Sequence, residues 1–249
     1  MEEVLFYSLA SVFIVSLISF IGIISLSIKI SKLKTILIYL ISFSAGALLG
    51  DAFIHLLPEI IKNEGYTLYS AIYLLSGITI FFILEKIIHW QHCHMPINHE
   101  HIHPFAYMNL VGDALHNFID GLIIAASYIV SIPVGIATTL AVILHEIPQE
   151  IGDFGVLLHG GFTKAKALVI NFLTGLTAIF GVLIVFWLGG FIEGIQEFLI
   201  PFAAGGFIYI AGSDLIPELH KETKINRSIG QIISFALGIC IMAILLFFE

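Results

Sequence analysis

The chain has 249 residues, of which 59% are hydrophobic and 11% charged, and its mean hydropathy is +1.04. A water-soluble protein needs roughly a quarter of its residues charged, so this composition excludes a soluble globular protein. The formal net charge of −8, without a basic patch in the sequence, argues against nucleic acid as a partner.

Apolar stretches of about 20 residues recur along the chain, each long enough to cross a hydrocarbon core of ~30 Å. They are continuous rather than alternating, which predicts helices and not β-barrel strands. The first stretch has no basic segment before it and is too long for a cleavable signal peptide. We predict an all-α integral membrane protein, a single transmembrane domain over residues 1–249, with spans at 4–28, 35–57, 66–88, 104–130, 132–159, 164–188, 198–217 and 227–248.

Basic residues predict the orientation of these spans. With eight spans, nine of the ten Lys and Arg residues fall on one side and only Lys62 on the other. The richer side is expected to be cytoplasmic, which places both termini outside, and we expect the cell membrane. The nine are Lys29, Lys32, Lys34, Lys86, Lys164, Lys166, Lys221, Lys224 and Arg227.

The longest loop, residues 89–103, holds six of the eleven histidines and is expected on the cytoplasmic side. Such a tract can bind borderline metals through imidazole and thiolate. The alternative is a polar loop whose histidines are only solvated. We expect weak, dynamic metal contact through His89, His92, Cys93, His94, His99, His101 and His103.

Two spans repeat each other in opposite orientation. Residues 43–59 read FSAGALLGDAFIHLLPE and residues 202–218 read FAAGGFIYIAGSDLIPE, so that His55 aligns with Asp214. A shared glycine packing seam explains the small residues, but not the matched polar residue or the closing Pro-Glu. Inverted repeats around a midplane site are common in secondary transporters, so we predict three spans, a central pair and three inverted spans.

The central pair, spans four and five, carries polar residues at mid-membrane depth. HNFID at 116–120 echoes HEIPQ at 145–149, and both histidines are expected past the middle of a ~30 Å core. In span four, spacing of i, i+3, i+4 and i+7 puts four polar residues on one helical face. The nine polar residues of the pair are Asp113, His116, Asn117, Asp120, His145, Glu146, Gln149, Glu150 and Asp153.

Ionisable side chains inside a bilayer cost several kcal/mol unless they are paired, coordinated or hydrated. Without a cation, repulsion would protonate several of these carboxylates or separate the helices. Imidazole with carboxylate is the donor set of zinc, iron(II) and manganese, whereas Mg²⁺ and Ca²⁺ prefer oxygen ligands. We therefore predict a transition-metal site. The alternative, satisfied core residues, suits one buried histidine better than nine polar groups.

Pro148 lies inside span five, next to these residues. A proline cannot donate to the carbonyl four residues earlier, here that of Leu144. We predict a bend and a freed carbonyl beside His145 and Glu146, where irregular backbone can line an aqueous cavity. The alternative is an ordinary packing kink.

HNFIDG in span four, HEIPQEIGDF in span five and AGGFIYIAGSDLIPEL in span seven resemble the ZIP (Zrt/Irt-like) metal transporters, and most closely the branch whose fifth span reads HExPHExGD. The resemblance covers the whole chain. It implies uptake of metal toward the cytosol, a homodimer, and an elevator-like shift of the central helices against spans two, three, seven and eight.

The resemblance also implies a binuclear site between the central helices. Its ligands would be His116, Asn117 and Asp120 from span four and His145, Glu146 and Gln149 from span five. Along the path, Asp51 and His55 match an outer pair and Asp214 an inner carboxylate. We add Asp113, Glu150 and Asp153 to this path.

Two departures from the family pattern weaken the second metal position. Gln149 stands where the branch has His and other members have Glu, and span six has no carboxylate. A neutral amide cannot bridge two dications as a carboxylate can. We expect one good site around His116, His145 and Glu146.

Two other classes of function remain as alternatives. A membrane-embedded zinc hydrolase would use an HExxH motif, but position 149 is Gln, so we do not expect an enzyme. A metal sensor would suit the loop 89–103, but it does not need acids spread from Asp51 to Asp214. We predict a divalent transition-metal transporter, with zinc the expected ion and iron, manganese or cadmium as others, and with the metal as cargo rather than cofactor.

Overall fold

The computed structural model describes residues 2–23, 30–65, 67–89, 104–189 and 195–248. Within these residues eight helices are long and apolar enough to cross a membrane, which confirms the predicted number. They cover Glu2–Ile23, Thr35–Lys62, Leu68–Lys86, Asn109–Val130, Ile132–Leu158, Lys164–Gly189, Glu197–Leu219 and Ile225–Leu245. No strand occurs in the described part of the chain.

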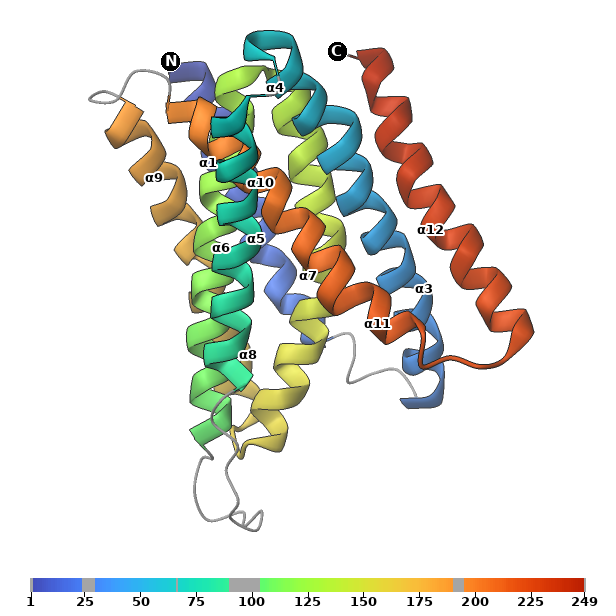
Figure 1. Ribbon diagram of the computed structural model, residues 1–249. Helices are drawn as coiled ribbons and strands as arrows, with labels where there is room; N and C mark the ends of the chain where they lie inside the picture. The colour runs from blue at the N-terminus through green and yellow to red at the C-terminus, as the bar shows by residue number, and fades with distance from the viewer. Residues whose placement is uncertain (1, 24–29, 66, 90–103, 190–194, 249) are drawn as a thin grey trace.

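Figure 1 shows the helices as one bundle, with the N- and C-terminal ends at the same side. In chain order the elements are α1 (Glu2–Leu17), η1 (Ile18–Phe20), α3 (Ile30–Gly50), η2 (Asp51–Leu56), α4 (Leu57–Glu64), α5 (Leu68–His89), α6 (Pro104–Val130), α7 (Ile132–His159), α8 (Lys164–Gly175), α9 (Thr177–Gly189), α10 (Ile195–Tyr209), η3 (Ile210–Leu215), α11 (Ile216–Leu219), α12 (Ile225–Leu245) and η4 (Leu246–Phe248).

Two of these segments, η2 and η3, are π-helical. In the repeat that pairs 43–59 with 202–218, η2 falls on η3 position by position. Each is followed by a proline, Pro58 or Pro217, whose nitrogen cannot donate to the preceding turn. A π-turn accommodates such a missing hydrogen bond, so the Pro-Glu endings that the sequence repeats correspond to a repeated local structure.

Glycines bring two pairs of helices into backbone contact. Between α3 and α12, a Cβ on Gly46 would lie 2.0 Å from the Phe235 carbonyl oxygen, and one on Gly238 would lie 2.2 Å from that of Phe43. Only glycine allows so close an approach. The contact holds α3 against α12, and Figure 1 shows the two helices side by side.

The same reciprocal contact joins α5 and α10. A Cβ on Gly77 would lie 2.1 Å from the Phe202 carbonyl oxygen, and one on Gly205 would lie 2.0 Å from that of Leu74. Gly205 aligns with Gly46 in the repeat, so the two pairs repeat one packing. This repetition supports the predicted inverted repeat, while the grouping into three, two and three spans stays a prediction.

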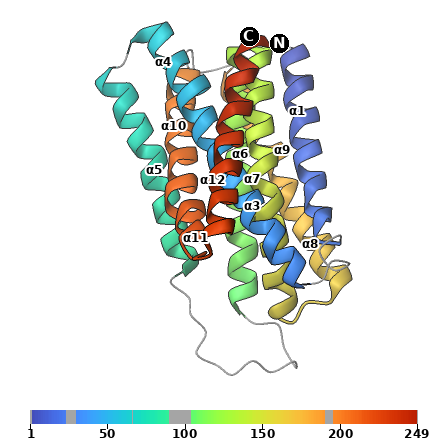
Figure 2. The ribbon, with the colours of Figure 1, turned by 90° about the vertical axis from the view of Figure 1, so that its right-hand side faces the viewer.

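A third glycine contact joins α6 to α9 through Gly121 and Gly181. Figure 2 shows α5 and α10 on one side of the bundle, α1, α8 and α9 on the other, and α6 and α7 between them. The central spans of the sequence therefore lie in the middle of the bundle. Span six is divided at Leu176 into α8 and α9, a break that the sequence analysis did not predict.

Candidate metal centre

The connection between α6 and α7 sets the two helices in register. Ser131 is the only residue between them, and its side chain caps α7 by accepting a hydrogen bond from the Val134 amide at 3.2 Å. His116 lies about four turns before this connection and His145 about four turns after it. The antiparallel helices therefore bring the two imidazoles to the same depth.

Four side chains converge between α6 and α7. His116 and Asp120 come from one turn of α6, at i and i+4, and His145 and Glu146 are neighbours in α7. One ligand atom from each lies within 4.8 Å of all the others. Of the predicted ligands, the structure brings these four together.

The distances between these atoms fit a tetrahedral metal. His116 Nε2 lies 3.1 Å from His145 Nε2, 3.2 Å from Glu146 Oε1 and 3.6 Å from Asp120 Oδ2. His145 Nε2 lies 3.3 Å from Asp120 Oδ2 and 3.5 Å from Glu146 Oε1. Ligands at about 2.0–2.1 Å around a tetrahedral zinc are about 3.3–3.4 Å apart. The five separations, from 3.1 to 3.6 Å, lie around that value.

The environment of the four side chains also favours a cation. Asp120 and Glu146 are completely buried, and no oxygen of either carboxylate accepts a hydrogen bond within the described residues. A buried anion without such partners is costly unless it is neutralised. Because the Ala141 carbonyl can only accept, the proton of neutral His145 must sit on Nδ1, 3.1 Å from that oxygen. This leaves the Nε2 lone pair free for a metal.

Pro148 leaves the Leu144 carbonyl without its helical donor, and a neighbouring helix supplies another. The Leu144 oxygen accepts a hydrogen bond of 2.5 Å from Ser44 Oγ on α3. Pro148 itself lies in the wall of a cavity, and α7 continues through it to His159.

This cavity, of about 350 Å³, adjoins the four-residue cluster. His116, 13% exposed, forms its inner end. One wall comes from α6 and α7 and the other from α3, α5, α10 and η3. Its polar lining consists of Glu85, Asn109, Asp113, His116, Gln149, Asp153 and Tyr209. Gln149, predicted as a ligand, thus lies along the cavity, on the route from the cluster toward the N-terminal end of α6.

Asn117 and Asp113 form a separate polar group beside the cluster. The Asn117 amide nitrogen donates to the Asp113 carboxylate at 2.8 Å and to its carbonyl oxygen at 3.2 Å, while Thr174 donates to the other carboxylate oxygen at 2.5 Å. Asn117 Oδ1 is buried and accepts no hydrogen bond within the described residues. The amide nitrogen is thus turned toward Asp113, and the oxygen is the atom left to act as a ligand.

Asp153 and Glu150, two predicted path residues, lie in different surroundings. Asp153 lines the cavity, accepts a hydrogen bond of 3.0 Å from Asn109, and keeps its buried Oδ2 without a hydrogen-bond partner among the described residues. Glu150 accepts hydrogen bonds from Ser19 and Asn171 and is absent from the cavity wall. Its carboxylate ties η1, α7 and α8 together, a structural position that the sequence did not indicate.

The predicted outer pair lies in η2 and is closed off from solvent. Asp51 accepts a hydrogen bond of 3.1 Å from Thr138 on α7, and His55 Nε2 donates to the Met242 carbonyl at 2.9 Å. Both side chains are buried. The backbone of Asp214 lies in η3, but its side chain is outside the described residues, as are the side chain of His89 and all of 90–103, which contain His92, Cys93, His94, His99, His101 and His103.

Sequence reasoning missed one acid that lines the cavity and two hydroxyl side chains that join helices around it. Glu85 on α5 lines it and accepts a hydrogen bond from Tyr209 on α10. An acid inside a predicted span was a visible signal, but the neighbouring Lys86 was read only as a mark of orientation. Ser44 on α3 donates to the Leu144 carbonyl of α7, and Thr138 on α7 donates to Asp51 of η2. These two residues gave no signal, since serine and threonine are common in spanning helices.

Proteins similar to this chain are named as zinc transporters. The family model described as ZIP zinc transporter matches residues 2–104 and 96–246. Zinc transporter zipt-7.1 of Caenorhabditis briggsae is 31% identical over 82% of this chain and 70% of its own length. Zinc transporter ZIP13 of Pongo abelii is 34% identical over 82% of this chain and 65% of its own length. The zinc transporter ZIP13 homolog of Drosophila melanogaster is 30% identical over 83% of this chain and 76% of its own length. The chain belongs to the ZIP zinc transporter family.

Proposed function

We propose that the chain carries Zn²⁺ across the membrane through the site formed by His116, Asp120, His145 and Glu146. The observation that carries this proposal is the spacing of four ligand atoms at the centre of a bundle of spanning helices: five of their six separations are 3.1 to 3.6 Å, near the tetrahedral value, and all lie within 4.8 Å. The relatives are named as transporters rather than enzymes, which supports the expectation that the chain is not an enzyme.

The four side chains His116, Asp120, His145 and Glu146 supply all the ligands of one tetrahedral metal ion, so Gln149 and Asn117 are not needed for it. Four donors satisfy tetrahedral zinc, and the amides of Gln149 and Asn117 would supply only neutral oxygens to a second ion. We therefore propose one strong site, with the amides as additional or transient ligands along the cavity. Mg²⁺, which prefers octahedral oxygen ligands, fits this donor set poorly. Fe²⁺ and Cd²⁺ can share it, whereas Mn²⁺ is better served by more oxygens.

The route would run from the η2 end to the cavity. Asp51 and His55 are buried and hydrogen-bonded, while His116 opens into the cavity on the opposite side of the cluster. This arrangement corresponds to a state open toward the end where most Lys and Arg residues lie. If that end is cytoplasmic, both termini are outside and zinc is released inward. It would then pass Asp113 and Asp153 first, and Asp214 and the histidines of loop 89–103 afterwards.

Two further expectations belong to this proposal. The family resemblance implies a homodimer, which chemical cross-linking tests. We also expect the chain in the cell membrane, which localisation of a tagged chain tests. The elevator-like shift would move α6 and α7 against the glycine-joined pairs α3–α12 and α5–α10.

Zinc uptake into proteoliposomes tests the function. The purified chain should give saturable ⁶⁵Zn²⁺ uptake that unlabelled Cd²⁺ and Fe²⁺ reduce, that Mn²⁺ reduces less and that Mg²⁺ leaves unchanged. Zinc binding without flux under an imposed zinc gradient or a pH gradient would favour the sensor over the transporter.

A further inference from the structure

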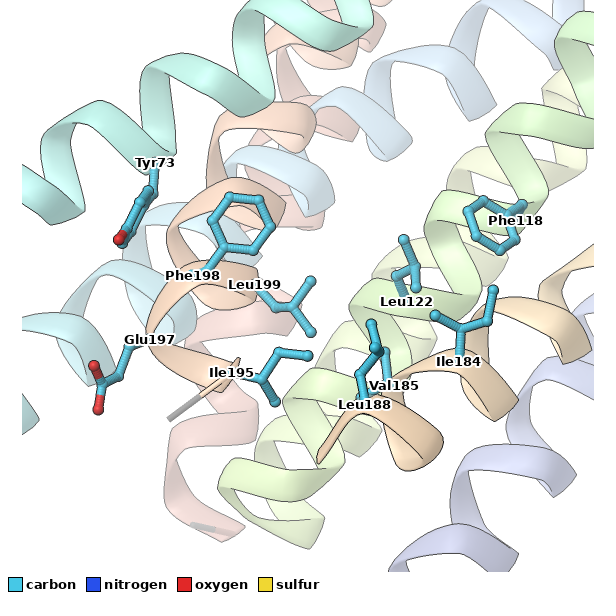
Figure 3. A pocket seen from close by; sticks show the side chains of 10 residues that line it. All are labelled: Tyr73, Phe118, Leu122, Ile184, Val185, Leu188, Ile195, Glu197, Phe198 and Leu199. Carbon is cyan, nitrogen blue, oxygen red and sulfur yellow. The ribbon is translucent and has the colours of Figure 1, made fainter. Parts of the chain in front are cut away.

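A second cavity of about 540 Å³ lies beyond the metal centre, toward the end of the bundle where α1 begins. Figure 3 shows its walls: Phe118 and Leu122 from α6 and Ile184, Val185 and Leu188 from α9 on one side, and Tyr73 from α5 with Ile195, Glu197, Phe198 and Leu199 from α10 on the other. None of its lining residues belongs to the four-residue metal cluster.

The two walls belong to two helix pairs that are each held by glycine contacts. Gly121 and Gly181 join α6 to α9, and Gly77 and Gly205 join α5 to α10. The cavity therefore lies in the seam between two closely packed helix pairs. A molecule bound in this seam contacts both helix pairs, so it must be able to change shape if the distance between the pairs changes.

The lining suits hydrocarbon and not water. Eight of the ten lining residues carry purely hydrocarbon side chains, and a buried water needs two to four polar partners. Cavities of about 150 Å³ with such walls stay dry and bind small apolar molecules. At about 540 Å³, this one has room for a longer alkyl chain.

The cavity opens on a surface that faces the bilayer. Ile184 and Phe198, on opposite walls, are 37% and 39% exposed, and both belong to spanning helices. Acyl chains are the molecules in contact with that surface. The groove is continuous with the lipid-facing surface of the protein and extends it inward between α9 and α10.

The polar end of the groove indicates which lipid fits. Glu197 is exposed at the start of the seventh span, where the headgroups of one leaflet lie. In Figure 3 the Glu197 carboxylate and the Tyr73 hydroxyl lie on the same side of the groove, away from Phe118. A carboxylate there attracts an ammonium group and repels an anionic headgroup.

We propose that this groove binds one acyl chain of a zwitterionic aminophospholipid whose ammonium group lies against Glu197. The lipid fills the seam between the α6–α9 and α5–α10 pairs. This inference is independent of zinc transport, because lipid retention is measured without zinc.

Native mass spectrometry of the purified full chain, exchanged from equimolar phosphatidylethanolamine and phosphatidylglycerol vesicles into mild detergent, tests the proposal. The native chain should retain phosphatidylethanolamine over phosphatidylglycerol by about fivefold. Leu122→Trp, which fills the groove, should lose the retained lipid. The control Leu183→Trp changes a leucine of α9 that is 45% exposed and outside the groove, and it should retain the lipid as the native chain does.

A second variant keeps the proposal testable if Leu122→Trp fails to fold. Glu197→Lys changes only the rim of the groove and should reverse the headgroup preference toward phosphatidylglycerol. Equal lipid retention by Leu122→Trp and Leu183→Trp would overturn the assignment of the groove. An unchanged headgroup preference in Glu197→Lys would overturn the assignment of the headgroup to Glu197.

Discussion

Ser44 on α3 and Leu144 on α7 are joined by a hydrogen bond of 2.5 Å from the serine hydroxyl to the leucine carbonyl. That carbonyl is the one that Pro148 leaves without its helical donor. The same hydroxyl lies 2.8 Å from the Leu40 carbonyl of its own helix, so a single proton serves two acceptors. The donor that this part of α7 lacks, beside His145, is therefore supplied by a side chain from a neighbouring helix.

Ser44→Ala should destabilise the protein and disturb the metal centre. The buried Leu144 carbonyl would lose its donor, at a cost of about 1–3 kcal/mol, and α7 could shift next to His145. We expect a lower unfolding temperature in detergent and weaker zinc binding by competition with a chelator. Ser42→Ala is the matched control, because within the described part of the chain the Ser42 hydroxyl donates to Ile38 of its own helix and to no other helix. Equal effects of the two substitutions would contradict the role of Ser44.

Zinc affinity should fall as the pH falls. A histidine nitrogen or carboxylate oxygen that holds a proton cannot bind the metal, so zinc must displace protons that the zinc-free site binds at low pH. Each displaced proton lowers the affinity by up to about tenfold per pH unit. Titrations with a competing chelator from about pH 7 to about pH 5 measure this slope. An affinity that does not change over this interval would exclude the imidazole-carboxylate site.

Gln149→His should add a second metal position. The described residues contain one four-donor cluster, and Gln149 lies along the adjoining cavity. An imidazole there supplies a stronger metal donor than the neutral amide of Gln149. Metal analysis of dialysed protein should give about one zinc per native chain and about two per Gln149→His chain. Two zinc ions already bound by the native chain would show that the amide suffices.

Gly46→Ala should prevent the close packing of α3 on α12. The new methyl group would lie 2.0 Å from the Phe235 carbonyl oxygen, and overpacking of this kind costs about 1–3 kcal/mol. Thermal unfolding in detergent measures the loss. Gly152→Ala is the control, since a Cβ at Gly152 meets no heavy atom within 4 Å. A Gly46→Ala chain as stable as the control would mean that the helices separate at little cost.

The sequence predicted the features that depend on composition and helical period. Eight spans follow from apolar length, and the i, i+4 spacing of His116 and Asp120 puts them on one face of α6. The neighbouring His145 and Glu146 were assigned as ligands from the family resemblance. The structure brings these four side chains together.

The sequence did not predict features that depend on contacts between helices. Glu150 accepts hydrogen bonds from Ser19 and Asn171, which belong to two other helical segments. The assignment of Glu150 to the path could therefore not be tested by sequence spacing alone. The orientation of the Asn117 amide depends on Asp113, one turn away, and on Thr174 of α8. The π-helical form of η2 and η3 could not be inferred from Pro58 and Pro217, because a proline can also produce a kink or end a helix.

Zinc flux through Glu146 tests the central claim most directly. We would compare ⁶⁵Zn²⁺ uptake into proteoliposomes by the native chain, by Glu146→Gln, which keeps the shape of the side chain, and by the control Glu3→Gln at an exposed acid of α1. Saturable uptake by the native and Glu3→Gln chains, with loss of uptake in correctly folded Glu146→Gln, is the predicted result. Native uptake by Glu146→Gln would show that zinc does not pass through the His116, Asp120, His145 and Glu146 site.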